Sequence, residues 1–212
     1  MNAFLKIPLY AFNIFYPFKL HGKENIPKKG ESAVLVCNHF RAIDCGFVAD
    51  AYSKDIKFLA KKELFKNKLF SKVLNAFGAI PIDRDKPDIK SLLSAVNYLK
   101  QGHKLAIFPE GTRNVSGTTE LQELKGGTAV FAIKAKCPIV PMMLSGKARC
   151  LRRTHLIIGK PFYLEEYYGK KLTDEDMAEI DKIIREKMCA EQAKLNDILT
   201  KKRRKKKKDA DN

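Results

Sequence analysis

A histidine and an aspartate five positions apart are the residues of this sequence best suited to move a proton. They stand in the segment NHFRAID, residues 38–44, directly after the apolar run 33–37. In a turn or a first helical turn, the carboxylate of Asp44 can reach one imidazole nitrogen of His39 and fix its tautomer. The other nitrogen is then free to take a proton, which is general base chemistry. The alternative is a histidine that only caps the end of a strand.

A second segment, FPEGTR at residues 108–113, carries groups suited to binding an anion. It supplies the carboxylate of Glu110, the hydroxyl of Thr112 and the guanidinium of Arg113, and Gly111 lets the backbone approach a ligand closely. Arginine can form two parallel hydrogen bonds with phosphate oxygens. The segment therefore indicates a phosphorylated ligand, and a turn with surface charges is the alternative.

Two further positions add basic groups near the same predicted site. Arg84 closes the segment GAIPIDR, residues 78–84, in which an apolar run ends on an acidic and a basic residue. Lys125 and Gly126 open a predicted helix, whose first amides and a lysine suit an anion. The alternatives are a surface ion pair for Arg84 and a glycine-rich turn at residues 125–127.

The elements that must position these residues alternate between short apolar runs and helical patterns. The predicted strands cover residues 33–37, 56–60, 78–82, 104–108, 138–144 and 155–159. The predicted helices cover residues 64–77, 88–101, 124–135 and 173–200. This alternation predicts the α/β class, with a single-domain layered fold and a largely parallel mixed sheet flanked by helices. In such sheets, sites form in the loops after the carboxyl ends of strands, where both segments lie.

In order and spacing, these segments resemble the motifs of the glycerolipid acyltransferases, the family of 1-acylglycerol-3-phosphate acyltransferases. Its blocks N-H-x-S-x-x-D, G-x-x-x-x-x-R, F-P-E-G-T-R-S and V-P stand here as NHFRAID, GAIPIDR, FPEGTRN and IVPMML. The resemblance covers roughly residues 20 to 165. Arg41 and Asn114 stand where the family pattern has serine, and neither change removes a catalytic group.

The resemblance implies a reaction and a role for each residue. A fatty acyl group would pass from acyl-CoA or acyl-acyl carrier protein to the sn-2 hydroxyl of 1-acyl-sn-glycerol 3-phosphate, a lysophosphatidic acid, and give phosphatidic acid. His39 and Asp44 would be catalytic. The resemblance assigns binding of the acceptor to Arg84, Glu110, Gly111 and Arg113. We add Thr112, Lys125 and Gly126 to this set of binding residues.

We expect direct transfer, without an acyl-enzyme, because the chain has no G-x-S-x-G motif and no cysteine in an evident activated setting. The substrate hydroxyl would then be the nucleophile. We expect no cofactor beyond the acyl donor, and no metal, because the five cysteines form no C-x-x-C pair. They are interpreted as reduced thiols of a core.

The formal charge of +17 predicts anionic partners. We divide the chain into an amphipathic membrane-association segment at 1–20, an acyltransferase domain at 21–200 and a polybasic tail at 201–212. Residues 1–20 are rich in aromatic and aliphatic side chains but are interrupted by prolines and a lysine, so we expect them to lie in a membrane interface. Packing of this segment on the protein's own core is the alternative. The chain would be a peripheral protein on the cytoplasmic face of an anionic membrane.

Two other functions remain open from the sequence. Within the family, the acceptor could be glycerol 3-phosphate or another lysophospholipid. From another class, a basic nucleic-acid-binding protein would explain the run KKRRKKKK at 201–208. Nucleic acid is the less favoured partner, because aromatic residues are not interleaved with the basic run and no recognition motif is present.

Overall fold

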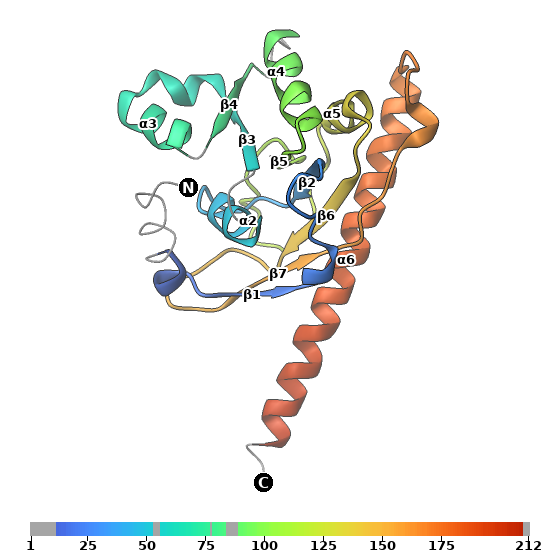
Figure 1. Ribbon diagram of the computed structural model, residues 1–212. Helices are drawn as coiled ribbons and strands as arrows, with labels where there is room; N and C mark the ends of the chain where they lie inside the picture. Colours follow the sequence, from blue (N-terminus) through green and yellow to red (C-terminus); the bar gives the residue numbers. More distant parts are fainter. Residues whose placement is uncertain (1–11, 53–55, 77, 84–88, 210–212) are drawn as a thin grey trace.

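The computed structural model describes residues 12–52, 56–76, 78–83 and 89–209 of the chain (Figure 1). Residues 12–15 form a short helical segment before the first strand. The elements then follow in chain order as β1 (Phe18–His21), β2 (Ala33–Cys37), α2 (Asp44–Tyr52), β3 (Ile56–Lys61), α3 (Lys68–Ala76), β4 (Ala79–Ile82), α4 (Ile89–Lys100), β5 (Lys104–Ile107), α5 (Thr128–Ala135), β6 (Ile139–Leu144), β7 (Thr154–Ile158) and α6 (Asp174–Lys208). Short 3-10 helices cover Lys23–Asn25, Lys62–Lys66 and Glu165–Tyr167.

The strands form one seven-stranded sheet in the order β1-β7-β6-β2-β5-β3-β4. Neighbours pair in parallel except β6 and β7, which are antiparallel. β1 and β7 therefore run opposite to the other five strands, so their first residues lie at the edge where β2, β5 and β6 end. The predicted α/β class with a largely parallel mixed sheet is confirmed.

Helices cover both faces of the sheet, because strands such as β2 are apolar at every position. Val34 and Val36 of β2 join a core with α4, α5 and α6. Leu35 and Cys37 join a second core on the opposite face, with α2 and the segment before β1. A strand buried on both faces reads as a continuous apolar run, and this is why β2 could be predicted from the sequence.

The first strand spans the predicted boundary between residues 20 and 21. Phe18–His21 form β1, which pairs in parallel with β7. Phe18 and Leu20 also pack against the core beneath α2. Residues 18–20 are therefore part of the folded sheet. Residues 1–11 of the predicted membrane segment lie outside the described residues.

The last helix likewise spans the predicted boundary between residues 200 and 201. α6 continues without interruption to Lys208, and it projects past β1 at the end of the molecule (Figure 1). Lysine and arginine are good helix formers, and positive charge is favourable at the carboxyl end of a helix. The basic run is thus the last part of α6.

Two helices differ from the sequence prediction. α5 begins at Thr128, after Gly127 with φ of 94° in the left-handed region, so Lys125 and Gly126 belong to the loop before it. α2 was not predicted, because its nine residues DCGFVADAY lack a clear apolar stripe. Within the described residues, none of the helices is both long and apolar enough to cross a bilayer.

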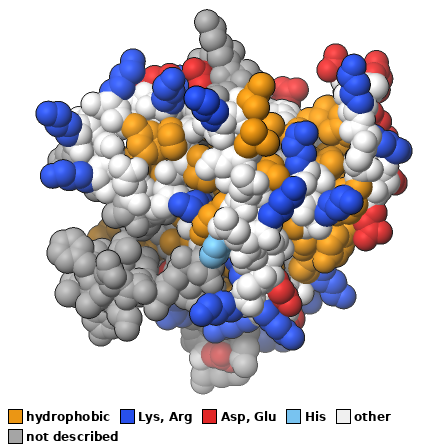
Figure 2. Space-filling view, turned by 45° about the horizontal axis from the view of Figure 1, so that its top comes forward, with side chains coloured by type: hydrophobic (Ala, Val, Ile, Leu, Met, Phe, Trp, Pro, Cys, Tyr) orange, Lys and Arg blue, Asp and Glu red, His pale blue; other side chains and the backbone are white. Residues whose placement is uncertain are grey.

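Lys and Arg side chains lie all around the face of the molecule drawn in Figure 2, with hydrophobic side chains exposed between them. The positive charge therefore belongs to the folded body as well as to the end of α6.

We predict that Ile184→Ala lowers the free energy of unfolding by about 2–5 kcal/mol, because Ile184 is fully buried where α6 packs on the sheet. Urea denaturation followed by circular dichroism measures the change. Ile89→Ala is the matched control, since Ile89 of α4 is 70% exposed and its truncation should change stability little. Equal losses for the two variants would contradict the packing of α6 described above.

Candidate active site

The two chemical segments of the sequence meet at one edge of the sheet. β2 and β5 are neighbours in parallel, with Val36 paired to Ile107. The loop of His39 follows β2 and the loop of residues 108–113 follows β5, so both leave the sheet at the same edge. This juxtaposition was expected from the position of the two segments after predicted strands.

His39 is paired with Asp44 as the sequence spacing predicts. The Nδ1 atom of His39 lies 3.0 Å from Oδ2 of Asp44. Because an ionised carboxylate only accepts hydrogen bonds, Nδ1 carries the hydrogen and Nε2 is the basic nitrogen. The imidazole also stacks on the ring of Phe108, with ring centroids 4.0 Å apart and planes 19° apart. These two contacts fix both the tautomer and the plane of the ring.

Asp44 is fully buried and organises the loop around it. Its Oδ2 also accepts hydrogen bonds from the backbone N–H groups of Phe40 and Arg41, each at 2.6 Å. Asp44 is the first residue of α2, where the helix dipole favours a negative charge. The aspartate thus serves as the folding centre of residues 39–44 as well as the partner of the histidine.

The loop after β5 forms hydrogen bonds with both backbone polar groups of His39. Oε1 of Glu110 accepts a hydrogen bond from the N–H of His39 at 2.7 Å, and the N–H of Asn114 donates to the carbonyl of His39 at 2.7 Å. Oε2 of Glu110 accepts from the N–H of Gln122 at 3.1 Å. The two chemical segments are therefore joined directly to each other.

Asn38 attaches the same loop to the next strand. Its side-chain oxygen accepts from the N–H of Leu144 at 2.8 Å, and its Nδ2 donates to the carbonyl of Leu144 at 3.1 Å. Leu144 is the last residue of β6, so this buried amide ties the ends of β2 and β6 together. His39 is thereby held from two neighbouring strands.

An apolar cavity of about 560 Å³ opens beside the imidazole. His39, Thr112 and Arg113, from the loops after β2 and β5, line it beside Phe108, and we call this part its polar end. Its walls come from the helical segment 12–15, the start of α2, the end of β3 and the residues around α3. They include Phe12, Ala42, Ile43, Cys45, Gly46, Phe58, Leu59, Ala60, Lys61, Leu64, Leu74 and Ala79. Such a cavity, with a base and a guanidinium at one end, fits a ligand with a long apolar part.

The predicted binding residues do not all reach this cavity. Gly111, Thr112 and Arg113 line it. Lys125 joins the same loop, because its N–H donates to the carbonyl of Pro109 and its side chain crosses Gly111. A Cβ on Gly111 would lie 2.7 Å from Cδ of Lys125, and the φ of Gly111 is 67°, so glycine is required here.

Glu110 and Gly126 lie elsewhere. Glu110 is 2% exposed, and both of its carboxylate oxygens are used by backbone N–H groups. Burial raises the pKa of Glu110, although its hydrogen bonds to His39 and Gln122 oppose the shift. This geometry fits a positioning role, in which Glu110 holds the backbone of His39. Gly126 faces Asp181 of α6, and Arg84 lies outside the described residues.

Among the described residues, Cys45 is the cysteine that lines this cavity. Burial, and then the charge of Asp44, raises the pKa of Cys45 to about 12, so the thiolate needed for attack is not formed near neutral pH. Within the same residues, no group of three or more metal-binding side chains lies together.

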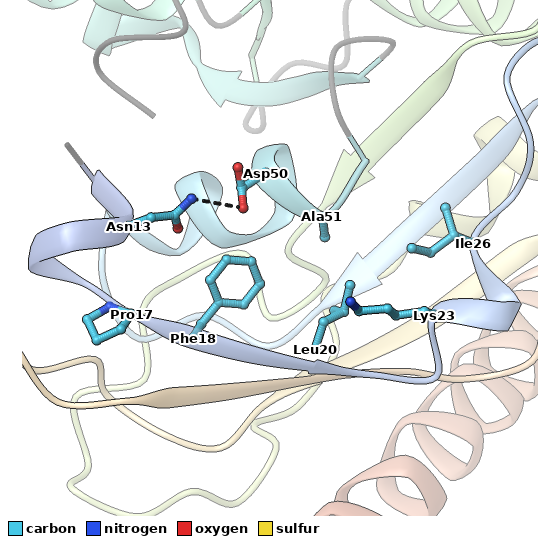
Figure 3. Close-up of a pocket in the computed structure, with 8 residues that line it drawn as sticks. All are labelled: Asn13, Pro17, Phe18, Leu20, Lys23, Ile26, Asp50 and Ala51. Atoms are coloured by element: carbon cyan, nitrogen blue, oxygen red, sulfur yellow. Dashed lines mark hydrogen bonds between the residues drawn. The ribbon is translucent and has the colours of Figure 1, made fainter. Parts of the chain in front are cut away.

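A second cavity, of about 530 Å³, lies between β1 and α2 (Figure 3). The Nδ2 of Asn13 donates to Asp50 at its rim, and Phe18 and Leu20 of β1 lie across from them. Among the described residues, none of those predicted to be catalytic or to bind the acceptor lines this cavity. The hydrogen bond fastens the helical segment 12–15 to α2.

Sequence reasoning missed several residues that hold the site. Asn38, Phe108 and Asn114 all stand inside the motif blocks, which is the signal that could have singled them out. Asn114, where the family pattern has serine, is buried and donates from Nδ2 to the carbonyl of Glu120. Arg41, at the other departure, uses its backbone N–H on Asp44 and leaves its side chain exposed.

The sequence also matches a known protein family. Residues 17–145, more than half of the chain, match the sequence model of the Acyltransferase family. This chain belongs to the acyltransferase family. The 1-acyl-sn-glycerol-3-phosphate acyltransferase of Bacillus subtilis is 32% identical over 155 residues, which are 70% of this chain and 75% of the relative. The protein of the same name from Streptococcus pneumoniae is 33% identical over 162 residues, 73% of this chain and 58% of the relative.

The fold of this acyltransferase also matches a solved structure. The crystal structure of the 1-acyl-sn-glycerophosphate (LPA) acyltransferase PlsC from Thermotoga maritima superposes with a TM-score of 0.66. It covers 93% of this chain and 83% of the other, at 20% sequence identity. At that identity the likeness shows a shared fold.

We predict that Glu110→Gln lowers both stability and activity, because one backbone N–H would then face an amide NH₂ in place of an acceptor oxygen. A buried, unsatisfied donor costs about 1–3 kcal/mol. Thermal unfolding and the rate of acyl transfer measure the two effects. Glu123→Gln is the control, since Glu123 is exposed in the same loop. A fully active and stable Glu110→Gln variant would refute the positioning role.

Proposed function

We propose that this acyltransferase acylates the sn-2 hydroxyl of 1-acyl-sn-glycerol 3-phosphate and so forms phosphatidic acid. The observation that carries the proposal is the oriented His39–Asp44 pair in the wall of an apolar cavity whose polar end carries Arg113. The names of the relatives from Bacillus and Streptococcus support the choice of acceptor.

In the proposed reaction, the hydroxyl of the lipid is the nucleophile. Nε2 of His39 takes the hydroxyl proton as the oxygen attacks the thioester carbonyl. The tetrahedral intermediate then collapses, the carbon–sulfur bond breaks, and the imidazolium returns the proton to the leaving thiolate. Asp44 holds the ring in the required tautomer and balances the positive charge that forms on it. The protein supplies no nucleophile of its own, in accord with the raised pKa of Cys45.

The acceptor phosphate would bind at the polar end of the cavity. Arg113 and Thr112 line that end and are both exposed there, and Lys125 lies beside them across Gly111. A guanidinium, a hydroxyl and an ammonium can together satisfy several phosphate oxygens. The apolar walls would take a fatty acyl chain, which positions the glycerol hydroxyl close to His39.

The acyl donor would be an acyl-CoA or acyl-acyl carrier protein, used as co-substrate without a further cofactor. Both donors are anionic, as is the membrane that supplies the acceptor, and the basic surface of the chain is complementary to them. We place the enzyme on the cytoplasmic face of a membrane as a peripheral protein. An assay of thiol release with a panel of lysophospholipids and glycerol 3-phosphate tests the acceptor, and inactivity with lysophosphatidic acid would refute the proposal.

We predict that His39→Ala lowers kcat by about 10²–10⁴-fold, because that is the usual contribution of a general base. The fold should remain, since the imidazole is a loop group and not part of the core. His103→Ala is the matched control. His103 stacks on Tyr98 just before β5 begins, at the opposite edge of the sheet, and should be dispensable for turnover. A His39→Ala variant with near wild-type kcat would remove the base from the mechanism.

We predict that Arg113→Ala raises the KM for lysophosphatidic acid by about ten- to hundredfold, the value of a lost hydrogen bond to a charged group. A monoacylglycerol without phosphate serves as the comparison acceptor, and its slow acylation should change little. An unchanged KM for the phosphorylated acceptor, or an equal loss with both acceptors, would contradict the phosphate-binding role.

A further inference from the structure

The loop between β6 and β7, residues 145–153, is tied to a segment far away in sequence. The N–H of Leu151 donates to the carbonyl of Phe15 at 2.6 Å, and the N–H of Thr154 donates to the carbonyl of Pro17 at 2.9 Å. The loop starts directly after Leu144, the residue that pairs with Asn38. It therefore leaves the sheet at the same edge as the loop of His39.

Three large hydrophobic side chains are exposed on these two tied segments. Ile14 is 55% exposed, Phe15 is 53% exposed and Leu151 is 71% exposed. The neighbouring residues of the helical segment point inward: Phe12 packs on Phe47 of α2, and Asn13 bonds Asp50 (Figure 3). The segment is thus anchored on one side and presents apolar groups on the other, and Phe12 also lines the catalytic cavity.

Leu151 is not explained by the needs of the fold. Its φ is 57°, a left-handed conformation that costs a residue with a Cβ about 1–2 kcal/mol. Glycine or asparagine would adopt it more readily, and the exposed leucine side chain recovers little by burial within the chain. A strained, exposed leucine points to a partner that covers it.

The residues around this apolar tip are basic. Lys147, Arg149, Arg152 and Arg153 are all exposed in the loop. Lys19 of β1 and Lys202 of α6 lie beside Arg153. Partial desolvation and then the charges of Lys19 and Arg153 lower the pKa of Lys202. Among the described residues, the ion pairs include none with Lys19, Arg153 or Lys202.

The same positive charges act on two stacked histidines of this region. Nε2 of His21 lies 2.9 Å from Nδ1 of His155, and the rings stack with centroids 5.2 Å apart. Burial, followed by the charge of Lys202, lowers the pKa of His155 to about 4, so it is neutral near pH 7. An anion bound at this surface would relieve the crowding of its cations.

We propose that residues 145–153, together with Ile14, Phe15, Lys19 and Lys202, dock on an anionic lipid bilayer. Leu151, Phe15 and Ile14 enter the interface between headgroups and acyl chains, and the surrounding cations bind lipid phosphates. A bilayer is the occupant because exposed apolar groups match its acyl-chain layer and the surrounding exposed cations match its anionic headgroups. Docking would direct the edge of the sheet with His39 toward the lipid acceptor, and in that respect it rests on the proposed function.

Vesicle co-sedimentation of the full chain tests the proposal. The vesicles are phosphatidylcholine with and without phosphatidylglycerol. Leu151→Asn should weaken binding to the anionic vesicles by about tenfold, because the variant no longer transfers a leucine side chain from water into the bilayer. Asparagine tolerates the positive φ, so the loop keeps its backbone. Leu93→Asn is the matched control: Leu93 of α4 is 52% exposed, outside the proposed surface, and its replacement should leave binding unchanged.

A second variant tests the charges. Lys202→Gln should weaken binding to anionic vesicles by about fivefold and leave the weak binding to pure phosphatidylcholine unchanged. Lys134→Gln, on the exposed side of α5, is its control. Equal binding of wild type, Leu151→Asn and Lys202→Gln, or equal binding to both kinds of vesicle, would overturn the proposal. A comparable loss in both controls would also overturn it, since the effect would then not belong to this surface.

The docking surface and the proposed function can fail independently. With a short-chain lysophosphatidic acid dissolved as monomers, Leu151→Asn should be as active as wild type, whereas its activity on vesicle-bound acceptor should fall. If wild type is inactive on both acceptors but its vesicle binding depends on Leu151, the proposed function fails and the docking surface stands. If Leu151→Asn loses activity on the soluble acceptor as well, Leu151 acts on the site itself and the docking role is refuted.

Discussion

One carboxylate oxygen orders the whole active loop. Oδ2 of Asp44 accepts hydrogen bonds from the imidazole of His39 and from the backbone N–H groups of Phe40 and Arg41. Because Asp44 is fully buried at the start of α2, the oxygen depends on these donors and on the helix dipole in place of water. The position of the base and the folding of its loop are consequently set by the same group, and neither can change alone.

Hydrogen bonds at the ends of neighbouring strands connect this loop to the residues proposed to bind the acceptor. Glu110 and Asn114 bind the two backbone polar groups of His39, and Asn38 binds both backbone groups of Leu144. Three parallel strands, β2, β5 and β6, thus end on one network of hydrogen bonds. Thr112 and Arg113 follow Glu110 in the chain, so the clamp that fixes the base also fixes the residues proposed to bind phosphate. The proposed direct transfer needs this precision, because the lipid hydroxyl must lie within reach of the imidazole nitrogen and of the thioester carbonyl at the same time.

The pairing of His39 with Asp44 and the meeting of the two loops could be predicted from the sequence, since both follow from local spacing and from strands that are apolar throughout. The role of Glu110 could not be predicted from the sequence. A carboxylate beside Arg113 is equally suited to a ligand or to backbone N–H groups, and only the fold of residues 38–44 against it decides between them. β1 and α2 were missed for a related reason: four and nine residues carry little periodicity, and long-range pairing and burial stabilise them.

The central claim is that the lipid hydroxyl attacks the thioester directly, with His39 as the base and no acyl-enzyme. The most direct test is rapid-mix thiol release from acyl-CoA, with intact-mass spectrometry of the protein, in the absence and presence of lysophosphatidic acid. The account predicts no burst of thiol and no change in protein mass until the acceptor is added, followed by steady release. A burst equal to the enzyme concentration without acceptor, with the mass of one acyl group added to the chain, would contradict it.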